Sequence, residues 1–150
     1  MNHEDVSRIR FEESCTIPAE QTACALFARL PHGCGDAERM VERIATGYLV
    51  AAIESICTGL LQRHVHADDE LVVIQRIYVE HGRPLPTGAR IALCGWVGGL
   101  GERSATFRVH AHHAQELVCE ALVTLTTMPR RNFRHCPCIL SNQDRTHGGL

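Results

Sequence analysis

The stretch ATGYLVAAIESICTGLL, residues 45–61, predicts the element around which the chain folds. Its apolar residues recur every three or four positions, which is the spacing of one broad helical face. They are Leu49, Val50, Ile53, Ile56, Cys57, Leu60 and Leu61. We therefore expect a buried helix from about Thr46 to Arg63. One residue departs from this apolar character, the carboxylate-bearing Glu54.

The hydrophobic period changes after this helix from that of a helix to that of strands. Alternating residues predict four strands, at about residues 71–81, 89–97, 105–112 and 117–125. In the first of them, Leu71, Val73, Ile77, Val79 and His81 share one face. Before the helix, alternation over residues 5–17 predicts one further strand, and Asp36 is placed to cap a short helix, AERMVER. An antiparallel sheet wrapped around one long central helix follows, an α+β fold.

The 150 residues are enough for a single domain with a sizeable core. We assign residues 1–128 to this domain. Residues 129–150 mix Arg, Asn, His, Pro and Gly without periodicity, and we expect them to form a poorly ordered tail.

Composition narrows the classes of function. The net charge is −2, so the chain lacks the basic field of nucleic-acid-binding proteins. It has neither an 18-residue apolar run nor an apolar N-terminal signal core, so we expect a cytoplasmic protein without a membrane span. Its eight cysteines sit mostly singly in apolar stretches, where cysteine acts as a small hydrophobe.

Two His-containing clusters raise the question of a metal site. His135, Cys136 and Cys138 form the segment HCPC, while His110, His112 and His113 form the second cluster. Structural zinc usually requires CxxC knuckles, and the chain has none. The alternation places His110 and His112 on the outer face of the sheet, so we expect no metal site.

Three polar residues are predicted to meet at the helix. Glu54 borders the apolar stripe, where it is either a solvated edge residue or a carboxylate kept for acid–base or nucleophilic work. His81 shares a strand face with Ile77 and Val79, as a core histidine or as a partner of Glu54. Thr46 lies in the first helical turn, beside unpaired N–H groups that can hold a carbonyl oxygen. Together they suit acyl transfer, with hydrolysis of an activated ester as the leading example.

These residues resemble a known family. The order of elements is similar to a hotdog-fold domain, and ATGYLVAAIESIC is similar to the helix of fluoroacetyl-CoA thioesterase-like proteins. That family has a Glu eight residues after the Thr and a His seven residues before the Gly of a Pro-containing turn. Here Thr46 precedes Glu54 by eight residues, and His81 precedes Gly88 by seven in HGRPLPTG. The resemblance spans about residues 5–128.

The resemblance implies an acyl-CoA thioesterase. It implies a homodimer whose sheets join edge to edge, or a dimer of dimers, with acyl-CoA pockets at the subunit interface. Thr46 would bind or activate the thioester carbonyl, Glu54 would act as nucleophile or general base, and His81 would be the acid–base partner. Gly47, in the same opening, and Ile74 are substrate-binding candidates.

Departures from the family bear on the substrate. The segment DAERMVERI lacks the aromatic lid residues of the fluoroacetyl enzyme, Ile74 stands where that enzyme has a glycine, and Leu125 stands where it has an Arg. Specificity for fluoroacetyl-CoA is therefore not expected. The identity of the acyl group stays open, and we expect a small or medium one. Arg83 and Arg103 are candidates for the coenzyme A phosphates, as are Arg130 and Arg131 beyond them, against the alternative of solvated surface residues. Coenzyme A enters as part of the substrate, and no other cofactor is expected.

Two other functions fit the same residues. One is a non-catalytic hotdog module that binds acyl-CoA. The other is a hotdog hydratase or dehydratase, in which His81 and Glu54 would flank the acyl C2–C3 bond. The Thr at the helix start favours hydrolysis over the latter.

Overall fold

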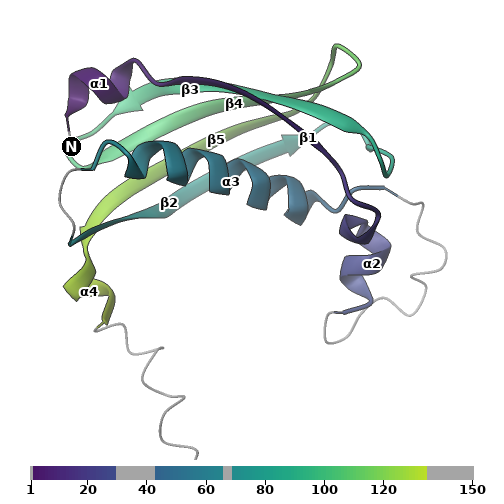
Figure 1. Ribbon diagram of the computed structural model, residues 1–150, viewed down its shortest axis with the longest axis horizontal. Helices are drawn as coiled ribbons and strands as arrows, with labels where there is room; N and C mark the ends of the chain where they lie inside the picture. The colour runs from purple at the N-terminus through teal and green to yellow at the C-terminus, as the bar shows by residue number, and fades with distance from the viewer. Residues whose placement is uncertain (1, 30–42, 66–68, 135–150) are drawn as a thin grey trace, which may run out of the picture.

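A computed structural model of the chain describes residues 2–29, 43–65 and 69–134. Within these residues one antiparallel sheet has the strand order β1-β3-β4-β5-β2. The strands are β1 (Arg10–Thr16), β2 (Glu70–His81), β3 (Arg90–Leu100), β4 (Ser104–His113) and β5 (Glu116–Pro129). The long helix α3 (Thr46–Gln62) runs along one face of the curved sheet (Figure 1). The predicted α+β fold and its central helix are confirmed.

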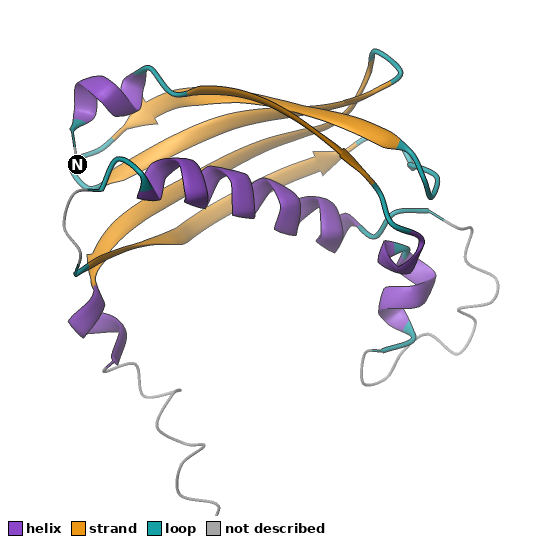
Figure 2. Cartoon of the chain, viewed as in Figure 1, coloured by secondary structure: helices purple, strands orange, loops and turns teal. Residues whose placement is uncertain are grey.

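The short elements lie at the ends of the sheet (Figure 2). They are α1 (His3–Ser7), the 3-10 helix η1 (Ala19–Gln21), α2 (Ala23–Phe27) and α4 (Arg130–Arg134). The strand predicted over residues 5–17 is wrong at its start. The Asn2 side chain accepts a hydrogen bond from the Glu4 N–H and caps α1, whose Val6 is buried. No described helix is both long and apolar enough to cross a membrane.

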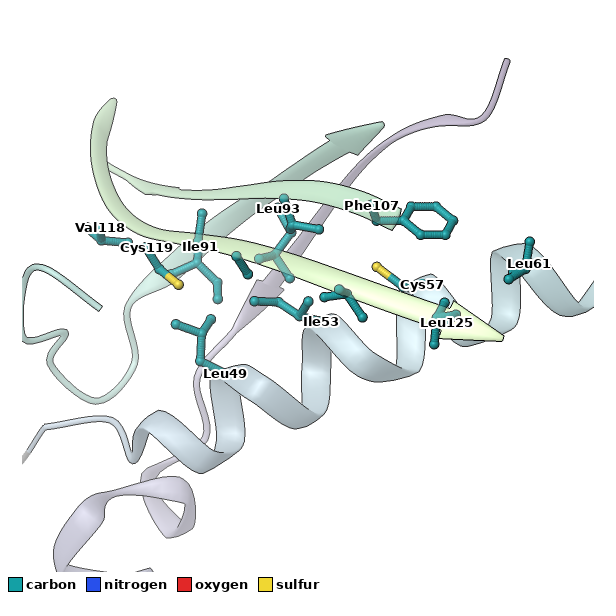
Figure 3. Close-up of a cluster of buried hydrophobic side chains, with 14 of the residues drawn as sticks. Leu49, Ile53, Cys57, Leu61, Ile91, Leu93, Phe107, Val118, Cys119 and Leu125 are labelled. Carbon is teal, nitrogen blue, oxygen red and sulfur yellow. The ribbon is translucent and has the colours of Figure 1, made fainter. Parts of the chain in front are cut away.

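The core lies between α3 and the sheet (Figure 3). Four helix residues at i, i+4 spacing, each at most 1% exposed, point toward the strands: Leu49, Ile53, Cys57 and Leu61. Opposite them lie the inward residues of the central strands, among them Ile91, Leu93, Phe107 and Leu125. Burying a large apolar side chain contributes about 1.5–3 kcal/mol, so this stripe holds the helix to the sheet.

Strand β2 departs from simple alternation. Its register with β5 shifts between Ile74 and Arg76, so Gln75 is an extra residue in the strand. Val72 and Ile74 therefore pack with the core, together with Ile77. The prediction that Leu71 and Val73 share a face with Ile77, Val79 and His81 is wrong, because the irregularity reverses the alternation on the N-terminal side.

The C-terminal boundary also differs from the predicted one. Pro129 still belongs to β5, and Arg130–Arg134 form α4 where an irregular tail was expected. The remainder of the tail, including HCPC, and the predicted helix at AERMVER lie outside the described residues.

Strands β1 and β3 approach closely at Gly95. A Cβ atom at this position would lie 2.5 Å from the Phe11 ring atom Cε1 and 2.8 Å from the Arg108 carbonyl oxygen. Real Cβ atoms do not approach other heavy atoms so closely, so Gly95 allows the Phe11 ring to lie over the strand.

We predict that Gly95→Ala lowers the free energy of unfolding by about 1–3 kcal/mol, because the main chain at Arg108 must move. Gly99→Ala is the matched control, since its Cβ would meet its nearest atom at 3.8 Å, and we expect a change below about 1 kcal/mol. Urea denaturation of both variants measures the difference. Equal stability of the two would contradict this account of Gly95.

Candidate active site

The N-terminus of α3 meets the end of β2. Thr46, the first helical residue, places its Oγ1 3.0 Å from Nδ1 of His81, the last residue of the strand. His81 lies opposite Cys119, in the inward alternation of Ile77 and Val79. The structure therefore brings together two of the three polar residues expected to meet.

Main-chain hydrogen bonds fix this junction from both sides. The segment before the helix is held by Ile44, whose N–H donates to the Leu85 carbonyl at 2.8 Å, and by Ala45, whose N–H donates to the Gln21 carbonyl at 3.0 Å. Leu85 follows His81 closely in the chain and is 1% exposed. The loop that leaves β2 thus positions the start of α3, so Thr46 and His81 are placed by one connected unit.

Burial favours the neutral form of the His81 imidazole. Burial of the imidazole lowers its pKa from the ordinary value of 6.5, and the main chain of Arg83 opposes this shift in part. Nε2 is buried, and no group of the described chain makes a hydrogen bond with it. A neutral ring with Nδ1 beside a hydroxyl can accept a proton from that hydroxyl, or orient it toward a bound group.

The first turn of α3 also offers donors. Ala45 precedes the helix and supplies no side-chain cap, and both Thr46 and Gly47 are exposed. The Tyr48 N–H already donates to the Ala45 carbonyl at 2.9 Å, whereas the N–H groups of Thr46 and Gly47 have no acceptor among the described residues. These two groups can bind an oxygen, and the positive end of the helix dipole favours negative charge there. A Cβ at Gly47 would meet Leu26 at an ordinary contact distance of 3.7 Å, so close packing does not explain the glycine.

Glu54 lies midway along α3, apart from the Thr46–His81 pair. At the far end of the helix, the Gln62 side chain accepts from the Val72 N–H at 3.1 Å and donates to the Glu70 carbonyl at 3.4 Å. Helix and strand therefore run antiparallel, held at both ends. Eight residues of helical rise separate Glu54 from Thr46 by about 12 Å along the axis.

The Glu54 side chain is exposed in the single chain and makes no hydrogen bond or ion pair with the described residues. Thr46 lies level with His81, and Gln62 lies level with Glu70 and Val72. Glu54 is halfway between Thr46 and Gln62 in the helix, so it lies level with the middle of β2, at about Ile74 and Arg76. Side chains tilt toward the start of their helix, which shortens the gap to Thr46. In the described sheet, β2 pairs with β5 alone, so its other edge is free.

The remaining predicted residues are placed as follows. Ile74 is partly buried against the core next to the bulge. Arg83 forms an ion pair with Glu116, and Arg103 forms one with Glu70. Both guanidinium groups therefore already have carboxylate partners at the surface, and their contact with coenzyme A stays a prediction.

Sequence reasoning missed Gln62 and the Gln75 bulge. A polar residue in the last turn of a helix carries no distinctive signal, because its partner is the main chain of a strand that begins several residues later. The described residues include no group of three or more His, Cys, Asp or Glu side chains arranged to hold a metal ion.

Comparisons with known proteins identify the family of the chain. Residues 33–130, more than half of the chain, match the model of the family described as FlK, fluoroacetyl-CoA-specific thioesterase. The chain belongs to this family. It is therefore a thioester hydrolase, as predicted from the resemblance. No curated protein sequence matches the chain.

Solved structures show the same fold as this member of the FlK family. The fluoroacetyl-CoA thioesterase FlK itself has a TM-score of 0.73 at 20% identity, with 84% of this chain and 90% of that chain covered. A variant of it in complex with fluoroacetate and CoA has a TM-score of 0.73 at 20% identity, covering 83% and 96%. A hot-dog-like protein from Thermanaerovibrio acidaminovorans has a TM-score of 0.73 at 11% identity, covering 89% and 93%. The hotdog fold predicted from the sequence is confirmed.

We predict that His81 is half-protonated below pH 6.5, because burial disfavours the imidazolium. An NMR titration of the ring in Thr46→Val, compared with wild type, separates burial from the hydroxyl contact. We expect the titration midpoint of the ring to stay below pH 6.5 in both proteins. The Nδ1 resonance should shift in Thr46→Val, because the hydroxyl beside it is lost. A midpoint above 6.5 in the wild type would contradict the neutral ring.

Proposed function

We propose that the chain hydrolyses a small or medium acyl-CoA thioester in a pocket between α3 and β2 that a second copy closes. The observation that carries this proposal is the Thr46–His81 hydrogen bond at the uncapped start of α3. A hydroxyl, an imidazole whose pKa is lowered by burial, and helix N–H groups lie together there, and this supports the binding of a thioester carbonyl at the same point.

The first turn of α3 would bind the carbonyl oxygen. As the carbonyl carbon becomes tetrahedral, negative charge develops on this oxygen, and donors already aimed at it stabilise that charge. The N–H groups of Thr46 and Gly47 would supply these donors. The Thr46 hydroxyl would join them when the His81 tautomer with hydrogen on Nδ1 donates to Oγ1, because the hydroxyl hydrogen is then left for the carbonyl oxygen. His81 holds the hydroxyl in place and serves as the acid–base partner.

Glu54 would act on the carbonyl carbon in one of two ways. As a general base it takes a proton from water, the water oxygen bonds to the carbon, the C–S bond breaks, and the proton passes to the leaving sulfur. As a nucleophile its oxygen bonds to the carbon and the thiolate leaves, after which water cleaves the resulting anhydride. Both courses yield a carboxylic acid and the coenzyme A thiol.

A second copy would complete the pocket. The free edge of β2 offers unpaired main-chain groups, and an edge-to-edge pair with another β2 would satisfy them. Such a pair covers the flank of α3 that bears Glu54, and so removes bulk water from around the carboxylate. The exposure of Glu54 in one chain is then a property of the separated subunit.

The size of the acyl group that we propose depends on the side chains of β2 that lie level with Glu54. Ile74 points inward beside the expected position of Glu54, and it occupies space that a glycine would leave open. The solved FlK variant binds fluoroacetate and CoA. For this chain we propose a small or medium acyl group on the same coenzyme, without selectivity for the fluorinated one.

We predict that Glu54→Gln lowers kcat/KM for acyl-CoA hydrolysis roughly 100-fold or more, the scale of a lost general base. Glu20→Gln, which changes an exposed carboxylate in η1, is the matched control and keeps wild-type activity. Free thiol is followed over a panel of short, branched and aromatic acyl-CoAs. Unchanged turnover in Glu54→Gln would refute the role of this carboxylate.

The same panel tests the other functions. Saturable binding of acyl-CoA by the wild type without thiol release would show a binding module. Reversible addition of water to an enoyl-CoA, with the thioester intact, would show a hydratase. Either outcome would replace hydrolysis as the function.

We predict that Glu54 acts with Thr46 and His81 of its own chain. Heterodimers of one Glu54→Gln chain and one His81→Asn chain, isolated through two different tags, should then be as inactive as either homodimer, because each site lacks one group. Homodimers carrying both tags on wild-type chains control for the purification. Recovery of thiol release in the heterodimer would show that the site combines residues from two chains.

A further inference from the structure

The inner face of β1 carries a carboxylate where the alternation of the strand calls for an apolar side chain. Glu13 pairs with Leu93 of β3, and residues directly opposite one another in a sheet lie on the same face. Leu93 is 1% exposed and belongs to the core between the sheet and α3 (Figure 3). Phe11 and Cys15, which share this face with Glu13, are partly buried against that core. Glu13 therefore lies on the face of the sheet that α3 covers.

A hollow lies beside this carboxylate, between β1 and α3, with a volume of about 250 Å³. Glu13 forms part of its wall. The apolar part of the wall consists of side chains that belong to the core or pack against it: Leu93, Tyr48, Ala52 and Ile56. Pockets for drug-sized molecules begin at about 300 Å³, so this hollow suits a smaller ligand.

The hollow is separate from the candidate active site. Tyr48, Ala52 and Ile56 recur at four-residue spacing, so they share one side of α3. Successive helix residues are about 100° apart, which turns Glu54 about 160° away from Ala52. His81 is equally remote, because β2 and β1 are the two opposite edges of the described sheet. A molecule in the hollow would therefore lie across the helix from Glu54.

The charge of Glu13 is unmatched in the part of the chain that the structure describes. Its carboxylate makes no ion pair or hydrogen bond with a described residue. The helix α3 contains neither Lys nor Arg, so it offers no cation to the hollow. Arg10 and Arg90, at the ends of the β1–β3 pair, alternate with the inward residues and so belong to the outer face. The hollow thus combines an apolar wall with one uncompensated negative charge.

We propose that this hollow binds a small organic cation, an amine with a short apolar body. The Glu13 carboxylate would pair with the ammonium group, and the aromatic ring of Tyr48 adds attraction for a cation. The apolar body would lie against Leu93 and Ile56. A ligand that is itself a carboxylate, such as the acid released from a thioester, would be repelled. Because the amine lies across α3 from Glu54, it is not placed to accept an acyl group, and its binding does not depend on hydrolysis.

Three ligands of similar shape and different charge test the assignment. Benzylammonium should bind the wild type saturably in isothermal titration calorimetry, whereas benzyl alcohol should bind more weakly and benzoate not at all. Glu13→Gln should raise the Kd for benzylammonium about fivefold or more, because a charge-assisted hydrogen bond is lost, and leave the Kd for benzyl alcohol unchanged. Glu12→Gln is the matched control. It removes the same charge one residue away, opposite Cys94 on the outer face, and should keep the wild-type Kd.

A further variant removes the space. Ala52→Leu should abolish the binding of both benzylammonium and benzyl alcohol, since the added atoms fill the hollow. Circular dichroism melting checks that every variant folds. In NMR spectra of the wild type, benzylammonium should shift the amide resonances of Tyr48 and Leu93.

Four results would each overturn the proposal. They are benzoate binding as tight as that of benzylammonium, an equal rise of Kd in Glu12→Gln and Glu13→Gln, wild-type affinity in a folded Ala52→Leu, and no saturable binding by the wild type. The last would leave Glu13 as a charge that only deters the addition of strands at this edge. Thiol release is not part of the measurement, so the outcome is independent of the proposed function.

Discussion

Two contacts, one at each end of α3, fix the position of the helix along β2. At the start, Thr46 meets His81, and at the end the Gln62 amide bonds to the main chain of Glu70 and Val72. The apolar stripe between these ends supplies the attraction, but apolar packing is not directional and tolerates sliding. The polar end contacts set the longitudinal register, and every distance in the candidate site depends on that register.

The same register accounts for the position of Glu54. A carboxylate within the apolar stripe would have been buried without a partner, at a large cost. On the flank, level with the middle of β2, it remains exposed to solvent in the single chain. The helix therefore keeps a stable core while carrying a charged group beside it.

Much of this arrangement could be predicted from the sequence. The 3.6-residue period of α3 and the two-residue period of β3, β4 and β5 led to the fold, and the in-phase position of His81 led to its contact with the helix.

The irregular parts could not be predicted in this way. One extra residue, Gln75, reverses the alternation of β2 without any change of composition, and α1 depends on a single cap at Asn2. The hydrogen bond from the Ile44 N–H to the Leu85 carbonyl joins two main-chain groups, and the pattern of side chains in a sequence does not predict such a bond. The pairing of Arg83 and Arg103 with surface carboxylates likewise depends on tertiary placement.

The bulge in β2 has a consequence for solubility. An edge strand with regular pleating and free main-chain groups can add strands without limit, as aggregating sheets do. In β2, Gln62 occupies the main-chain groups of Glu70 and Val72, and the extra residue twists the strand just beyond them. Only the segment after the bulge is both regular and clear of these contacts, so the length of edge open to another strand is short. The feature that obscured the strand in the sequence thus shortens the stretch of this edge to which strands of other molecules can add.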